Sequence, residues 1–424
     1  MDHGCSSTKI SKYVAEEDII SNLPDGLKDK ILCCLPIKEA VRTCLLSRKW
    51  RYTWTSMTEL MFRGDDFASE NDNENDLQCR FLKFTDMFLS LHNGPVLKFR
   101  LDTLGIEIST RGHIYRWMLM LSRNRIKEIQ LMTSMHEDYN IPSSFFSCAE
   151  LEYVQLRLCV WTTSQLPMLY KGFKHLHTLH LEFFTVEGNN FGDLVASFPN
   201  LEKLTLFWLI SFANINIHST KLKILTVHGR FNHLSLHTPY LTSAVIELKQ
   251  VAGDALNARC NFNVSQFIAS LSDVKNISLH GSIFELAEHE FLVYKPPKSF
   301  NQLTEISLYL DLGNLKQANL ALCLFQHAPN SQLINLKLTS KNPMVPTVHL
   351  WESIDGCLFQ NVRVVGMNNF TASSAELAFL KRILEDAPVL RKAEIRDKGK
   401  LGKDDLKSLL KMRRASKDAE IVIF

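Results

Sequence analysis

A short apolar pattern recurs along most of the chain: an apolar residue, two variable positions, a second apolar residue, one variable position and a third apolar residue. The last two apolar positions alternate with variable ones, which predicts a short strand with one face turned inward. Four consecutive units begin 25 residues apart, at 126, 151, 176 and 201. The units begin at Val96, Ile126, Leu151, Leu176, Leu201, Leu222, Leu241, Val274, Leu303, Leu333, Val362 and Leu390.

A single strand of this kind cannot bury its inward face alone, but strands stacked in parallel form one continuous core. Burying each Leu or Ile stabilises the array by roughly 1.5–3 kcal/mol. The repeat therefore predicts an α/β leucine-rich-repeat solenoid, curved as a horseshoe. Most units lack the Asn or Cys that usually follows the strand, with Cys159 as the clear occupant, so we expect irregular turns. Longer gaps at 247–273 and 280–302 predict loop insertions.

The stretch from Leu23 to Trp54 follows a different pattern. Pro24 and Pro36 each precede an apolar run with helical spacing, which predicts three short helices separated by tight turns. Units below about 40 residues rarely bury enough apolar surface to be stable alone. The surplus apolar residues indicate a second protein that covers them, although the pattern alone equally fits a small helical subdomain packed on the repeats.

The string LPDGLKDKILCCLPIKEAVRTCLLSRKWRYTW, which begins at Leu23, resembles an F-box. Both Leu-Pro pairs, the Ile-Leu pair and the Leu-Ser-x-x-Trp-Arg ending stand at the expected spacing. F-boxes dock substrate receptors onto the Skp1-like adaptor of cullin-RING ubiquitin ligases. The resemblance implies that role for Leu23, Pro24, Ile31, Leu32, Leu35, Pro36, Val41, Leu46 and Trp50.

The end of the chain predicts a helix between Ser373 and Ala387, capped by Ser373 or Ser374, then a strand over 390–395. A helix within 404–412 and a strand over 419–424 follow. This region resembles the FBD region that follows the repeats in many plant F-box proteins, chiefly in FLKRILEDAPVLRKAEI and RRASKDAEIVIF. The resemblance implies a β-α-β cap on the solenoid.

The predicted organisation has five parts. An acidic, Asn-rich stretch over 65–76 predicts an exposed loop, and apolar spacing over 81–91 predicts a helix that ends at His92. The parts are a disordered tail at 1–15, an all-α F-box at 16–62, an acidic loop and linker helix at 63–95, leucine-rich repeats at 96–357 and an FBD-like region at 358–424.

Composition and motifs disfavour catalysis by this chain. The net charge of +3 indicates no special attraction to nucleic acid or anionic membrane. The ten cysteines include no C-x-x-C, and no nucleophile or phosphate-loop motif occurs. His175, His177 and His180 form the tightest histidine cluster, but histidines on a strand surface are more often ordinary polar side chains, so no metal site is expected. No secretory signal or membrane span is found, and we expect a protein of the cytoplasm or nucleus without a cofactor.

In each predicted strand, the residues between and just after the two core-facing residues lie on the opposite face of the sheet. That face is the inner, concave side of the predicted horseshoe, where a target protein would bind. Aromatic residues, Met and Arg are enriched at binding interfaces. The candidates are Met132, Arg157, His180, Phe207, His228, His280, Tyr309 and Lys337. We expect a substrate receptor of an SCF-type ubiquitin ligase; the alternative is an interaction scaffold with no ubiquitination output.

Overall fold

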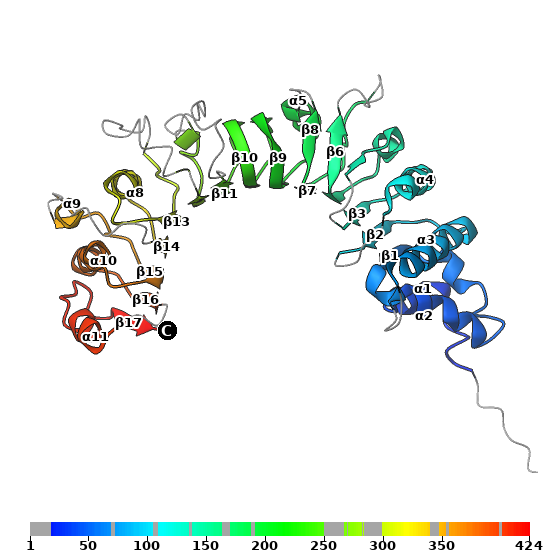
Figure 1. Ribbon diagram of the computed structural model, residues 1–424, viewed down its shortest axis with the longest axis horizontal. Helices are drawn as coiled ribbons and strands as arrows, with labels where there is room; N and C mark the ends of the chain where they lie inside the picture. Colours follow the sequence, from blue (N-terminus) through cyan, green and yellow to red (C-terminus); the bar gives the residue numbers. More distant parts are fainter. Residues whose placement is uncertain are drawn as a thin grey trace, which may run out of the picture.

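The computed structural model describes residues 18–68, 73–104, 109–134, 138–162, 170–187, 191–249, 267–268, 270–281, 283, 299–339, 347–352, 356–397 and 401–424. In this part of the chain, 14 parallel strands form one sheet that runs from β1 to β17. The sheet lines the inner side of an arc, and helices cover its outer side (Figure 1). The prediction of a mixed α/β chain with a large parallel sheet is confirmed.

The strands of the main sheet follow one another in chain order, apart from three strands that form a second sheet. The main sheet contains β1 (Glu59–Arg63), β2 (Lys98–Asp102), β3 (Glu128–Met132), β5 (Tyr153–Arg157), β7 (Thr178–Glu182), β9 (Lys203–His218), β10 (Ile224–His237), β11 (Ser243–Leu248), β12 (Asn276–Gly281), β13 (Glu305–Leu310), β14 (Leu333–Leu338), β15 (Val364–Phe370), β16 (Lys392–Asp397) and β17 (Glu420–Ile423). The second sheet contains β4 (Tyr139–Asn140), β6 (Cys159–Thr162) and β8 (Thr185–Glu187).

The core lies on the helix-covered face of the sheet and consists of side chains that stack from strand to strand. Leu179 on β7 pairs in register with Leu204 on β9, and Leu204 pairs with Leu225 on β10. The exposed fractions of these three side chains are 1%, 0% and 0%. Each strand therefore buries its alternate residues against the next, as the repeat predicts.

One strand of the sheet, β1, was not predicted, whereas the strand predicted over 419–424 is present as β17. Met57, Leu60 and Phe62 follow the spacing of the repeat and are buried, with the last two on β1. At the other end, β17 pairs its Ile421 with Ala393 of β16. The array therefore begins inside the segment predicted to be all-helical.

For the unit at Leu333, the pattern predicts Leu336 and Leu338 as the core-facing pair, and this prediction is wrong by two residues. The structure pairs Ile306 with Ile334 and Leu308 with Leu336, so Leu333 falls on the opposite face. Ser331 occupies the first position of this unit, where other units carry an apolar residue. It is buried, and its hydroxyl donates a hydrogen bond to the Ala328 carbonyl at 2.8 Å.

The helices are α1 (Asp25–Cys33), α2 (Ile37–Arg42), α3 (Glu74–Leu91), α4 (Arg111–Leu121), α5 (Phe191–Ala196), α8 (Leu315–His327), α9 (Val348–Glu352), α10 (Ser374–Asp386) and α11 (Lys403–Leu410). Short 3₁₀ turns are η1 (Thr43–Leu45), η2 (Thr53–Ser56), η3 (Gly64–Phe67) and η4 (Ser143–Ser147). The predicted cap of α10 is confirmed: the Ser373 hydroxyl accepts from the Glu376 backbone N–H, and the Glu376 carboxylate accepts from the Ser373 N–H, a capping box.

Two local predictions are corrected. The third helix of the N-terminal segment is replaced by η1, turns and η2, because Trp50 and Trp54 are buried from short turns rather than from one helical face. The acidic stretch is not wholly an exposed loop, since Phe67 is buried against Phe81 and α3 begins at Glu74. Most of the predicted insertions at 247–273 and 280–302 lie outside the described residues.

Neighbouring residues on β10 test the stacked core. Leu225 is 0% exposed and Ile224 is 40% exposed on the other face. We expect Leu225→Ala to lower the free energy of unfolding by about 2–5 kcal/mol, because it leaves a cavity between strands. Ile224→Ala, the matched control, should cost less than about 1 kcal/mol. Urea denaturation measures both, and equal losses would contradict the assignment of faces.

Candidate adaptor-docking and target-binding surfaces

Several aliphatic side chains of the N-terminal helical segment remain exposed in the folded chain. Within residues 18–56, seven aliphatic side chains are exposed: Ile19 (71%), Ile20 (60%), Leu27 (47%), Ile31 (40%), Leu35 (37%), Leu45 (83%) and Leu46 (70%). We call this set the apolar patch. Leu27 and Ile31 share one face of α1, four residues apart. The Ser21 and Ser47 hydroxyls lie 3.0 Å apart and bring the first and last parts of the patch together.

The nine residues predicted to dock an adaptor occupy different environments. Pro24, Ile31, Leu35, Pro36 and Leu46 are exposed, Leu23 and Val41 are half-buried, and Leu32 and Trp50 are buried. A buried side chain supports the shape of the surface instead of touching a partner. The most exposed member of the patch, Leu45, was missed because the motif match assigned the role to its neighbour Leu46.

The segment is fixed to the sheet by a buried junction. The Asp29 carboxylate on α1 accepts a hydrogen bond from the Thr58 N–H at 3.0 Å and another from the Thr58 hydroxyl at 2.8 Å. The Cys33 thiol lies 3.7 Å from the same carboxylate, and burial raises the pKa of this thiol to about 11. Trp54 packs on Phe88 of α3 with ring centroids 5.0 Å apart. The helices therefore cannot rotate freely against β1.

The inner face of the sheet carries the eight residues predicted to bind a target. Seven of them occupy one equivalent position per strand, and His180 lies in the adjacent row. Their availability differs: Arg157 (8% exposed) and His228 (6%) are buried among their neighbours. Met132, His180, Phe207, His280 and Tyr309 are half-buried, and Lys337 is exposed.

An aromatic and charged cluster occupies the middle of this row. The Phe207 and His228 rings stack 4.4 Å apart, and His228 Nε2 lies 3.2 Å from Glu247 Oε2. Burial lowers the pKa of His228, partly offset by Glu247, so the ring is neutral near pH 7. Sequence reasoning missed Trp208, which is 38% exposed and contacts His228 with centroids 4.5 Å apart. Its φ of 55° places it on this face out of strict alternation.

Other kinds of site are not found in the part of the chain that the structure describes. No three His, Cys, Asp or Glu side chains gather there as a metal-binding group. None of the described helices has both the length and the apolar character needed to cross a bilayer.

Comparisons with known proteins place two parts of the chain in described families. A family model for the F-box domain matches residues 20–60, and a model described as "FBD-associated F-box protein At5g56370, LRR repeats" matches residues 114–264. The chain is 28% identical over 388 residues to the F-box/FBD/LRR-repeat protein At1g13570 of Arabidopsis thaliana, which covers 88% of this chain and 89% of the relative. It is also 28% identical over 357 residues to the Arabidopsis F-box/FBD/LRR-repeat protein At3g52680, covering 78% and 73%.

The junction generates a testable prediction. Asp29→Ala removes the acceptor of two hydrogen bonds and should lower the stability of the junction by about 1–3 kcal/mol. Hydrogen–deuterium exchange should then be faster in peptides spanning residues 53–63 and unchanged in peptides from β9 and β10.

The matched control is Asp25→Ala on the same helix, because the Asp25 side chain is 99% exposed. Equal acceleration in both variants, or none in Asp29→Ala, would argue against a rigid junction.

Proposed function

As a relative of the plant F-box/FBD/LRR-repeat proteins, this chain carries an F-box, and we propose that it is the substrate-receptor subunit of an SCF-type cullin-RING ubiquitin ligase. The N-terminal segment docks onto a Skp1-like adaptor, and the inner face of the sheet holds a target protein. The observation that carries this proposal is the apolar patch, which lies in the segment matched by the F-box model.

The patch has the chemistry that such docking requires. Exposed apolar groups of this density mark interaction surfaces in soluble proteins. Covering a Leu or Ile side chain contributes roughly 1.5–3 kcal/mol, and several together exceed the cost of association. Leu32 and Trp50 serve as the internal support that holds Ile31, Leu35 and Leu46 outward.

We interpret the arc as a leucine-rich-repeat horseshoe with an FBD-like end. The family model for the repeats covers part of the arc. The predicted FBD-like region at 358–424 contains β15, α10, β16, α11 and β17, which continue the same sheet. In this interpretation the boundaries at 62 and 358 divide the chain by sequence family, while one core runs through all the parts.

The proposed mechanism is proximity. Binding the target and the adaptor on one rigid chain raises the effective concentration of target lysines near the ubiquitin-loaded conjugating enzyme. No acid–base chemistry is required of this chain. The proposed location is the cytoplasm or the nucleus, where cullin-RING complexes act.

Adaptor docking is tested with full-length protein co-expressed with a Skp1-like protein. The double change Leu45→Asp and Leu46→Asp places charge in the interface and should weaken co-purification by about 100-fold or more. Leu410→Asp is the matched control, since Leu410 is 62% exposed on α11 at the opposite end of the chain. Undiminished binding of the double variant, with the circular dichroism of the sheet intact, would refute docking through this patch.

Reconstitution with a cullin–RING complex, activating enzyme and conjugating enzyme separates a receptor from a scaffold. We expect autoubiquitination of the wild-type chain and none of the Leu45→Asp, Leu46→Asp variant. Adaptor binding without any ubiquitin transfer would favour the scaffold alternative.

A further inference from the structure

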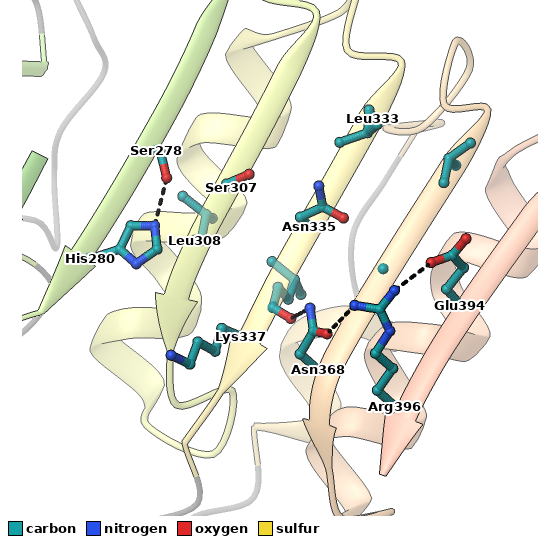
Figure 2. A pocket seen from close by; sticks show the side chains of 13 residues that line it. Ser278, His280, Ser307, Leu308, Leu333, Asn335, Lys337, Asn368, Glu394 and Arg396 are labelled. Carbon is teal, nitrogen blue, oxygen red and sulfur yellow. Dashed lines mark hydrogen bonds and ion pairs between the residues drawn. The ribbon is translucent and has the colours of Figure 1, made fainter. Parts of the chain in front are cut away.

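The inner face of the sheet is hollowed over β12 to β16. The hollow has a volume of about 530 Å³, within the range of ligand pockets (Figure 2). Its floor consists of short side chains: Ser278, Ser307, Asn335 and Gly366 occupy one row across four strands. A Cβ on Gly366 would lie 2.5 Å from Asn335 Oδ1, so the glycine keeps the floor open.

One side of the hollow presents hydrogen-bond donors and positive charge. Lys337, Asn368 and Arg396 line this side from three neighbouring strands (Figure 2). Arg396 Nη1 donates to Asn368 Oδ1 at 3.4 Å, and its Nη2 lies 3.5 Å from Glu394 Oε2. These contacts hold the guanidinium in position before any ligand arrives.

Lys337 supplies the second positive charge on this side of the hollow. It is exposed, and its ammonium lies 5.2 Å from the centroid of the Tyr309 ring. Among the described residues, no carboxylate lies within ion-pair distance of Lys337. The lysine therefore lies beside the Tyr309 ring and has no carboxylate partner among the described residues.

The charges that line the hollow leave a surplus of one positive charge. Lys337 and Arg396 are cationic, and His280 is neutral near pH 7 because burial lowers its pKa. Glu394 is anionic and is already paired with Arg396 and, at 2.7 Å, with Lys392 beside the hollow. The opposite side is apolar and contains Leu333 and Val364. Such a lining complements a segment that carries one singly charged anion and, further along, an aliphatic group.

We propose that this hollow recognises an Asp or Glu carboxylate of an extended target segment, with an aliphatic side chain elsewhere in the same segment against Leu333 and Val364. The proposal rests on the proposed receptor function and adds the chemical class of what is recognised. Adjacent strands lie about 4.8 Å apart, so five strands span about 19 Å, the length of roughly six residues of extended chain. A single carboxylate matches the single charge of Lys337, which has no carboxylate partner among the described residues, whereas a phosphate group carries close to two negative charges.

The test uses full-length protein with its adaptor and fluorescent seven-residue peptides, measured by fluorescence anisotropy. Each peptide has Leu or Val at randomised flanking positions and a fixed central Glu, Gln, phosphoserine or Lys. We expect the Glu pool to bind at least about tenfold more tightly than the Gln pool, the size of one hydrogen bond to a charged group. Equal binding of the Glu and Gln pools, preference for phosphoserine, or no binding of any pool would overturn the proposal.

Two variants and a matched control assign the binding to the hollow. Lys337→Met should weaken the Glu pool by about tenfold and leave the Gln pool unchanged. Gly366→Val should weaken both pools, because its side chain fills the floor. Lys203→Met is the control, since Lys203 is an exposed lysine of β9, outside the hollow; an equal loss in this variant would point to unspecific charge attraction.

Adaptor co-purification is measured in the same samples. Loss of peptide recognition with the adaptor still bound would reject the hollow alone. Recognition of the Glu pool by a chain that binds no adaptor would reject the receptor function and leave the hollow as a peptide site.

Discussion

The constraint on which the structure depends is that no strand of the arc is stable alone. Each strand buries its core-facing side chains and pairs its backbone through the strands beside it. The first strand, β1, pairs with β2 on one side, and its other side belongs to the segment that contains α1 and α2. The F-box-like segment is therefore also the N-terminal cap of the sheet. One side of this segment covers the end of the core, and another side exposes aliphatic side chains to solvent.

Parts of this arrangement follow from sequence because alternation is a strong signal. Phe99 and Leu101 pair with Ile129 and Leu131 as the repeat predicts. The unit at 333 fails because Leu333, Ile334, Leu336 and Leu338 fit two registers, and pairing with β13 chooses between them. The second sheet was missed because strands of two to four residues, such as β4, carry no measurable alternation.

The binding surfaces were predicted less completely, because burial is a collective property. The motif match assigned the same role to Ile31 and Leu32. The packed structure distinguishes them, because Leu32 is buried and Ile31 is exposed. On the inner face, position along the strand predicted the correct side, but Arg157 and His228 are largely covered by their neighbours. The hollow could not be predicted from the sequence for another reason: it arises where side chains are short, as at Ser307 and Gly366, and such residues carry no reactive or charged group that would mark a site.

The junction of Asp29 with Thr58, and of Trp54 with Phe88, has a mechanical consequence. The stretch over 63–95 is not a tether, since Phe81 and Phe88 of α3 are fully buried in the common core. The described residues from α1 to β17 therefore share one continuous core. In the receptor proposed above, the number of strands between the docking segment and the target site would set which lysines of a bound protein come within range of a transferring enzyme. Gaining or losing a single repeat during evolution would then redirect the modification without altering either proposed contact surface.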